Sequence, residues 1–326
     1  MHLLITGAAG FIGSNFVRKL LAGAYGSEPV DQVTVLDKLT YAGNLANLES
    51  VADDPRYRFV EGDICDPEVL DELLPGVDVV VNFAAESHVD RSISGPATFI
   101  ETNVAGAQTL FEACRKAGTE RVVHIGTDEV YGSIDEGSWT EDSPLLPNSP
   151  YSAAKASAEL LARAYFRTYG MNISTTRCSN NYGPYQFPEK IIPLFVTNLV
   201  DGKKVPVYGE GQNIRDWLHV DDHCSGIWTV LTSGDAGEAY NIGGGTEMTN
   251  LALTDLILSQ MGVGDEMIVT VEDRLGHDAR YSVNDSKLRK LGYSPAVEFD
   301  EGLKATVDWY LANEQWWRPL LKAPNA

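Results

Sequence analysis

The sequence predicts an α/β protein built on a doubly wound parallel sheet, with a smaller mixed α/β lobe in its second half. Two observations carry this prediction. Short apolar runs alternate with amphipathic helical patterns through the first half of the chain, which is typical of a parallel sheet covered by helices. The first apolar run leads directly into a glycine-rich loop and a helical pattern, an arrangement that binds dinucleotides in doubly wound folds.

The glycine loop lies between a short apolar strand and an amphipathic helix within residues 2–15. Gly7, Gly10 and Gly13 recur every three residues. Glycine permits a tight turn and a close approach of backbone to a pyrophosphate, which then sits at the helix N-terminus. A glycine triad alone is often only a turn, but the strand–loop–helix setting favours a dinucleotide site. We therefore expect a Rossmann sheet at the start of the chain.

Three further strands are expected over residues 33–36, 57–60 and 77–83. The first of these ends at Asp37, where a carboxylate can accept hydrogen bonds from the adenosine ribose and repel a 2′-phosphate. Asp37 therefore favours NAD over NADP, and the alternative is that it only caps the next helix. The strand over 57–60 leads to Asp63, which we expect near the adenine amino group.

The candidate catalytic residues form two groups after a fifth apolar run over 121–125. Thr127, Asp128 and Glu129 should emerge where this buried strand ends. Neighbours on a strand point to opposite faces, so both carboxylates reach one substrate only if the backbone turns there. Tyr151 and Lys155 share one helical face, and a lysine beside a phenol favours the phenolate, a usable base. Two adjacent carboxylates add an acid and a base.

Composition narrows the class of protein. The 326 residues are 44% hydrophobic and 22% charged, as in soluble globular proteins. No apolar run approaches about 20 residues, so we expect a cytoplasmic protein without a membrane partner. The four cysteines lack metal-ligand spacing, so no metal is expected. A formal charge of −21 argues against nucleic acid. An anionic substrate would then need a local basic cluster, for which the candidates are Lys190, Arg215, Arg274, His277 and Arg280.

The second lobe begins where the alternating pattern weakens. We expect a nucleotide-binding domain over 1–180 and a mainly substrate-binding, discontinuous domain over 181–326. A helical pattern over 219–231 and a strand over 239–242 indicate that the chain returns to the main sheet near 217–242. The Asn-, Gly- and Pro-rich segment 180–190 is typical of a structured loop. The segments around Arg215 and Arg274 also have the composition of loops that bind ligands.

With these motifs in order, the chain resembles the extended short-chain dehydrogenases/reductases, and among them the dTDP-glucose 4,6-dehydratases, over nearly its full length. The glycine loop and the Tyr151/Lys155 pair fit any member of the larger family. The adjacent Asp128 and Glu129 carry the narrower resemblance, since the related sugar-nucleotide epimerases lack both carboxylates. The other matching segments lie at 37–44, 84–90, 127–132, 215–217 and 274–281.

The resemblance implies a redox-neutral reaction on dTDP-glucose, in which bound NAD is regenerated in each cycle. Tyr151 would remove the 4-hydroxyl proton, assisted by Lys155 and Thr127. Glu129 would take the C5 proton and Asp128 would protonate the departing 6-hydroxyl, leaving the 4-keto-6-deoxy sugar. The implied cofactor contacts are Gly7, Gly10, Phe11, Ile12, Gly13, Asp37, Lys38, Thr40, Gly43, Asp63, Ile64, Ala84, Ala85, Tyr151 and Lys155. The implied substrate contacts are Ser87, Thr127, Asn180, Lys190, Arg215, Asn250, Arg274, His277 and Tyr281.

Several alternatives stay open at this stage. A sugar-nucleotide 4-epimerase would share the oxidation step, and an NAD-binding regulator would share the fold without needing the catalytic residues. Asn180 and Asn250 could cap loops, and Tyr281 could serve core packing. Helical segments near 101–117 and 152–169 carry small and apolar residues that suit a four-helix interface in a homodimer.

Overall fold

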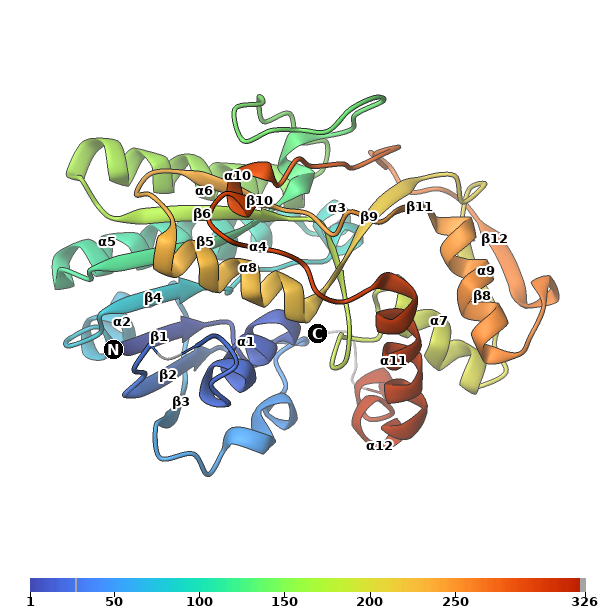
Figure 1. Cartoon of the computed structure of the whole chain (residues 1–326), viewed down its shortest axis with the longest axis horizontal. Helices are drawn as coiled ribbons and strands as arrows, with labels where there is room; N and C mark the ends of the chain where they lie inside the picture. The colour runs from blue at the N-terminus through green and yellow to red at the C-terminus, as the bar shows by residue number, and fades with distance from the viewer. Residues whose placement is uncertain (27, 323–326) are drawn as a thin grey trace.

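The computed structural model describes residues 1–26 and 28–322. Its centre is a parallel seven-stranded sheet in the order β10-β6-β5-β4-β1-β2-β3 (Figure 1). The strand order reverses direction between β1 and β4, and ligands of doubly wound sheets bind in the crevice at such a point. The strands are β1 His2–Thr6, β2 Gln32–Asp37, β3 Tyr57–Glu61, β4 Val79–Asn82, β5 Arg121–Thr127, β6 Ile173–Cys178 and β10 Ala239–Ile242.

Helices cover both faces of this sheet, which explains why its strands read as apolar runs rather than alternating patterns. On one face, Phe16 and Ile227 belong to a core shared by the sheet with α1 and α8. On the other face, Leu110 and Ala158 belong to a second core with α2, α5 and α6. These helices are α1 Phe11–Leu21, α8 Val220–Ser233, α2 Pro67–Leu73, α5 Ala107–Ala117 and α6 Pro150–Tyr169.

The remaining strands lie beside this body at the right of Figure 1. One small sheet has the order β11-β9-β7, and another pairs β12 with β8. Phe195, Trp217 and Leu303 belong to a separate apolar core here. The elements are β7 Asn180–Tyr182, α7 Ile191–Val200, β8 Val205–Tyr208, β9 Ile214–His219, β11 Glu247–Thr249, α9 Asn250–Met261, β12 Ile268–Val271, α11 Phe299–Ala312 and α12 Glu314–Trp317.

Short helices complete the described chain. They are η1 Leu45–Val51, α3 Val89–Ser94, α4 Pro96–Phe99, η2 Ile100–Gly106, η3 Asp128–Tyr131, η4 Asp265–Met267, α10 Ser286–Arg289 and η5 Leu320–Lys322.

The predicted fold class is confirmed, including the return of the chain to the main sheet through β10, which pairs in parallel with β6. One local prediction was wrong. Arg215 lies in strand β9, not in a loop, because β9 pairs with both β7 and β11. The helical segment expected over 101–117 is present, as the π-helix η2 followed by α5. Asn103 of η2 bonds the backbone of Glu86 through both side-chain atoms, at 2.8 and 2.9 Å. The domain bounds 1–180 and 181–326 stay a prediction.

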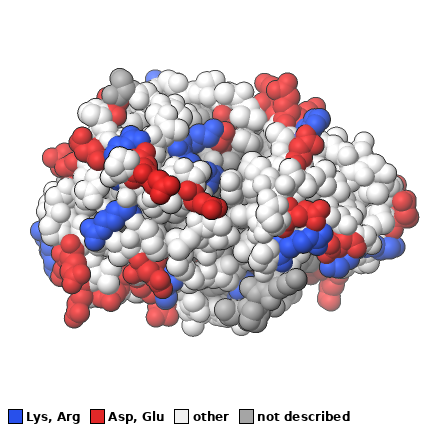
Figure 2. Space-filling view, turned by 90° about the horizontal axis from the view of Figure 1, so that it is seen from below, with Lys and Arg blue, Asp and Glu red and all other residues white. Residues whose placement is uncertain are grey.

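Acidic side chains are prominent around the rim of the face shown in Figure 2, whereas few charged side chains lie at its centre. The prominence of acidic side chains on this face agrees with the net charge of −21. Within residues 1–26 and 28–322, no helix is long and apolar enough to cross a membrane.

Candidate active site

The glycine loop after β1 lies directly against the chain after β4. Gly7 has a φ of +69°, and a Cβ there would stand 2.5 Å from the backbone of Ala84. A Cβ on Gly13 would stand 2.7 Å from the Cα of Ala8. Gly10, the N-cap of α1, offers no side chain to cap the helix, so N–H groups of the first turn face the loop. The loop therefore fits a pyrophosphate at the helix N-terminus.

The Asp37 carboxylate connects the glycine loop to the segment that follows β2. Its Oδ2 accepts a hydrogen bond from the backbone N–H of Ala9 and its Oδ1 from that of Leu39, both at 2.8 Å. The helix-cap alternative is wrong, because Asn44 caps η1. Asp63, the predicted adenine contact, pairs with Lys38 at 2.6 Å. Both carboxylates line the cavity.

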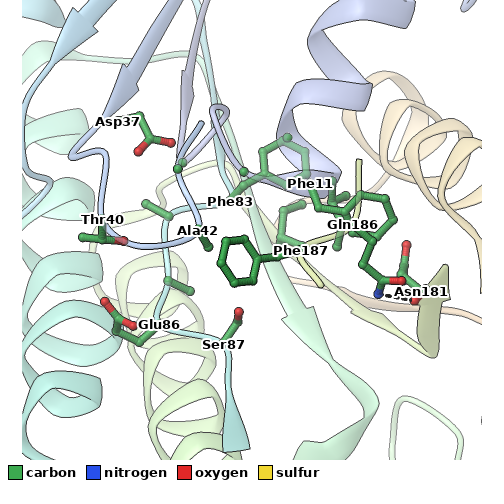
Figure 3. A pocket seen from close by; sticks show the side chains of 18 of the residues that line it. Phe11, Asp37, Thr40, Ala42, Phe83, Glu86, Ser87, Asn181, Gln186 and Phe187 are labelled. Carbon is green, nitrogen blue, oxygen red and sulfur yellow. Dashed lines mark hydrogen bonds between the residues drawn. The ribbon is translucent and has the colours of Figure 1, made fainter. Parts of the chain in front are cut away.

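One cavity joins the predicted nucleotide site to the predicted catalytic residues along the carboxyl ends of β1, β4 and β5. Figure 3 shows part of its lining, with Asp37, Thr40 and Ser87 among the labelled residues. The predicted residues that line it are Gly7, Gly10, Phe11, Ile12, Gly13, Asp37, Lys38, Thr40, Gly43, Asp63, Ile64, Ala84, Ala85, Ser87, Thr127, Asp128, Glu129, Tyr151, Lys155, Asn180 and Lys190. Sequence reasoning missed other lining residues, among them Asn47, Glu86, Thr102, Asn181, Tyr185, Gln186, Phe187 and Trp316.

The backbone turns where the two carboxylates need it to turn. Strand β5 ends at Thr127, and the short helix η3 carries Asp128 and Glu129. Thr127 caps η3 by accepting a 3.3 Å hydrogen bond on its hydroxyl from the N–H of Glu129. Both carboxylates therefore line the same cavity, as a shared substrate requires.

The two carboxyl groups differ in environment. Asp128 is 3% exposed, and its Oδ2 has no hydrogen-bond partner among the described residues. Burial raises the pKa of Asp128 well above its ordinary value, and the neighbouring Glu129 carboxylate adds to the shift. Burial also raises the pKa of Glu129, but the cations of Arg274 and Lys190 oppose that shift. The pair therefore suits one protonated and one ionised carboxyl group.

Tyr151 and Lys155 lie in the first turns of α6, and both side chains are buried. The Lys155 ammonium donates to the backbone carbonyl of Ile125 at 2.5 Å, and burial lowers its pKa to about 8. Burial raises the pKa of Tyr151 well above 10, and Glu129 raises it further, while a side-chain hydrogen bond with Thr127 opposes the shift. In this structure burial, not the lysine, dominates the pKa of the phenol.

The predicted basic residues gather beside Glu129. Lys190 lines the cavity and donates to the carbonyl of Ser87 at 3.0 Å. Arg215 lies over the ring of Tyr281, with 4.3 Å between its Cζ and the ring centroid. The charges of Arg274, Lys190 and Arg215 all lower the pKa of Glu129. A local basic cluster therefore exists within the acidic protein.

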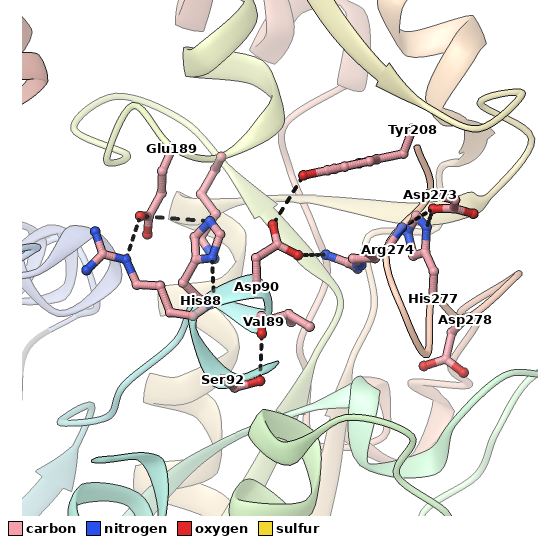
Figure 4. Close-up of polar contacts among 12 residues, drawn as sticks. His88, Val89, Asp90, Ser92, Glu189, Tyr208, Asp273, Arg274, His277 and Asp278 are labelled. Carbon is pink, nitrogen blue, oxygen red and sulfur yellow. Dashed lines mark hydrogen bonds and ion pairs between the residues drawn. The ribbon is translucent and has the colours of Figure 1, made fainter. Parts of the chain in front are cut away.

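Acidic partners hold Arg274 and His277 in place (Figure 4). Arg274 pairs with Asp90 of α3 at 3.8 Å, and His277 pairs with Asp273 at 2.6 Å. Tyr208 donates its hydroxyl hydrogen to Asp90 at 3.3 Å. Arg280, by contrast, pairs with Glu247 at 2.6 Å.

Five predicted substrate contacts do not line the cavity, namely Arg215, Asn250, Arg274, His277 and Tyr281. Asn250 begins α9, and its backbone N–H donates to the carbonyl of Asn213 at 3.0 Å. Tyr281 is 3% exposed and donates its hydroxyl hydrogen to Asp278 at 2.6 Å. Their roles as substrate contacts stay predictions. No group of three or more His, Cys, Asp or Glu side chains in the described part of the chain is arranged to hold a metal ion.

Comparison with known proteins identifies the family that shares this fold and this site. Residues 4–306 match the family model described as GDP-mannose 4,6 dehydratase. A dTDP-glucose 4,6-dehydratase of Streptomyces niveus is 57% identical over 326 residues, covering 100% of this chain and 97% of that protein. The crystal structure of DesIV, the dTDP-glucose 4,6-dehydratase of Streptomyces venezuelae solved with NAD bound, has a TM-score of 0.97 and 61% identity, covering 98% of this chain and 100% of that one.

More distant structures share the fold. The UDP-glucose 4-epimerase of Thermotoga maritima has a TM-score of 0.88 and 30% identity, covering 96% of this chain and 100% of that one. The fold and the site therefore define a nucleotide-sugar-modifying enzyme of the 4,6-dehydratase class. Within that class, the chain belongs to the dTDP-glucose 4,6-dehydratase family.

Proposed function

We propose that this chain catalyses the NAD-dependent 4,6-dehydration of dTDP-glucose to dTDP-4-keto-6-deoxyglucose, and that NAD stays bound and is regenerated in each cycle. The enzyme is then a hydro-lyase of deoxysugar biosynthesis. The single observation that carries the proposal is the turn at η3, which presents Asp128 and Glu129 to the cavity that Tyr151 and Lys155 also line.

In the oxidation step, Tyr151 removes the proton of the 4-hydroxyl, while Thr127, its hydrogen-bond partner, holds the sugar oxygen. NAD supplies a hydride acceptor for C4 and later a hydride donor for C6. Because burial opposes ionisation of Tyr151, a cation must stabilise the phenolate. Lys155, one helical turn away on the same face, keeps its proton up to a pH of about 8 and supplies that charge.

In the elimination step, the new 4-ketone acidifies the C5 hydrogen. Glu129 takes this proton, because the nearby cations favour its ionised form. Asp128, which burial keeps protonated, donates a proton to the departing 6-hydroxyl, so that water leaves. Glu129 afterwards returns a proton to C5 as hydride reaches C6, which restores the Glu129 carboxylate. Asp128 has then given one proton to the departing water, and Tyr151 holds the one taken from the 4-hydroxyl. Transfer of a proton from Tyr151 to Asp128, directly or through solvent, completes the cycle.

The basic cluster would hold the diphosphate of the substrate. Arginine suits this task because its planar fork binds two phosphate oxygens at once. Arg215 and Arg274 lie near Glu129, so a diphosphate bound by them would leave the sugar within reach of the carboxylates. Lys190 and Ser87 at the cavity wall, with Asn180, Asn250, His277 and Tyr281, complete the proposed contacts.

The protein would act as a homodimer. Helix α6 and the helical segment before α5 expose large apolar side chains, with Leu160 56% and Ile100 51% exposed. Tyr169, at the end of α6, is 56% exposed. Packing these helices against a second copy would remove this apolar surface from water. A cytoplasmic location stays a prediction from the sequence.

A product assay tests the proposal. Purified protein incubated with dTDP-glucose should release a product lighter by one water, with no net consumption of NAD. The Glu129→Gln variant should accumulate bound NADH without losing water, since Tyr151 can still oxidise C4. Conversion of dTDP-glucose to an isomer of equal mass would instead indicate that the protein is a sugar-nucleotide 4-epimerase.

A further inference from the structure

A buried polar network lies directly behind the turn that carries the two carboxylates. Its central residue is Tyr131, the last residue of η3, which is 0% exposed. The Tyr131 hydroxyl donates to Asn241 Oδ1 of β10 at 2.8 Å. It also accepts a hydrogen bond from Arg177 of β6. None of these side chains lines the cavity, so none contributes to the proton transfers described above.

Arg177 connects this turn to the helix of the catalytic tyrosine and lysine. Its Nε donates to both carboxylate oxygens of Glu159 at 3.0 Å, and the two side chains are 5% and 7% exposed. Glu159 lies on α6 one turn beyond Lys155. A buried ion pair contributes little net stability. Separating its two partners is nevertheless costly, because each would be left as an unpaired charge in the protein interior.

Other contacts hold the same turn from the side opposite the cavity wall. The carbonyl of Val130 accepts a hydrogen bond from the N–H of Leu146 at 2.9 Å. The ring of Trp139 stacks on that of Tyr131, with 5.9 Å between their centroids. Arg177 also donates to the carbonyl of Glu141 at 3.1 Å. The segment after the turn thus closes over Tyr131 and Arg177 together.

We propose that Tyr131 and Arg177 are positioning residues for the elimination step, which set the Asp128–Glu129 turn at a fixed distance from α6. The inference rests on the proposed function. Tyr151 acts on C4 and the two carboxyl groups act on C5 and C6 of the same bound sugar. Elimination therefore requires the turn and the helix to keep one relative position, and Arg177 bonds to a side chain of each, Tyr131 and Glu159.

The test uses Tyr131→Phe in the full-length protein with its bound NAD. This change removes one hydroxyl, while Arg177 keeps Glu159 and the Glu141 carbonyl as partners, so folding should survive. Single-turnover measurements with dTDP-glucose would follow bound NADH, exchange of the C5 hydrogen with deuterated solvent, and loss of water. We expect C5 exchange and water loss to slow by up to about 10²-fold, as displacements near 1 Å can do, with NADH formation and KM close to those of the unaltered protein.

A matched control is Tyr293→Phe, because Tyr293 is 3% exposed and its hydroxyl has no partner among the residues that the structure describes. It should leave all three rates unchanged. Arg177→Lys keeps a positive charge but cannot reproduce the fork, and it should slow elimination in the same selective way.

Equal slowing of oxidation and elimination in Tyr131→Phe, or loss of its fold or its NAD, would overturn the proposal and assign Tyr131 a general structural role. Normal elimination in Tyr131→Phe would overturn it as well. Both results differ from failure of the proposed function, in which the unaltered protein itself would form no dehydrated product.

Discussion

Asp128 and Glu129 are adjacent in the chain, yet their surroundings give them different chemistry. Asp128 is almost fully buried, with one carboxylate oxygen lacking a partner within the described residues. Glu129 is partly exposed and lies near Arg274 and Lys190. Burial favours the neutral acid and a nearby cation favours the carboxylate. We propose that these environments, and not the residue types, decide which carboxyl group is the acid and which is the base.

The burial of Asp128 predicts a dependence of stability on pH. Its pKa is higher in the folded than in the unfolded state, so its stabilising protonated form is fully present below its ordinary pKa of about 4. That contribution is lost as the pH rises through the folded-state value. Asparagine cannot ionise, so Asp128→Asn should unfold at a higher temperature than the unaltered protein at pH about 7. The difference should shrink toward pH about 4.

Thermal unfolding followed by circular dichroism across this pH range measures the effect. Asp142→Asn is the control, since Asp142 is exposed, and it should show no such trend. A difference between Asp128→Asn and the unaltered protein that stays constant with pH would mean that Asp128 does not carry a raised pKa.

Cavity residues with acidic, basic or hydroxyl side chains in a known motif could be predicted from the sequence. Cavity residues that only close the cavity could not. Thr127, Asp128, Glu129, Tyr151 and Lys155 all line the cavity, because strand ends and helical spacing determine where such side chains point. Trp316 was missed. Its indole N–H donates to Asn47 at 2.9 Å across 269 positions of the chain, a contact that no local pattern encodes.

At the scale of elements, α6 positions Tyr151 and Lys155 through its N-terminal cap. The Ser149 hydroxyl accepts from the N–H of Ser152 at 3.1 Å, and the Ser152 hydroxyl accepts from the N–H of Ser149 at 3.1 Å. This reciprocal pair is a capping box. It satisfies backbone donors within two residues of Tyr151 and fixes where the helix begins.

Ser149→Ala should therefore lower the free energy of unfolding by about 0.5–2 kcal/mol. Urea unfolding measures this loss. Ser157→Ala is the control, because Ser157 lies inside the same helix and its hydroxyl donates to the carbonyl of Ala153 at 2.8 Å. It should change the value by no more than about 0.5 kcal/mol. If the two substitutions lowered the free energy of unfolding equally, the cap would have no special role in stability.

Elements formed by neighbouring residues were easier to predict than elements formed by distant pairing. The turn at Asp128 followed from the requirement that both carboxylates face one substrate, and η3 provides it. The composition around Arg215 predicts a loop, whereas the structure has strand β9 there. Its partners β7 and β11 lie more than 20 residues away on either side and are only three residues each, so the sequence around Arg215 has no strand pattern of its own.

At the scale of the whole molecule, the proposed dimer would use the exposed face of α6. Leu160→Glu should place a charge in that interface and give a monomer, because an unpaired charge cannot be buried without a large cost. Sedimentation velocity would compare it with Leu311→Glu, which alters a 44% exposed leucine of α11 in the other part of the fold and should remain dimeric. A dimeric Leu160→Glu variant would exclude this face as the interface.

We propose that one cavity oxidises C4, eliminates water and returns the same hydride to C6. The sharpest test uses dTDP-glucose carrying deuterium at C4, with the purified protein and no added reductant. We predict a product lighter by one water that carries the deuterium at C6, since the label passes from C4 to the bound cofactor and from there to C6 without exchange. A product that has lost the label, or a labelled isomer that has lost no water, would contradict this mechanism.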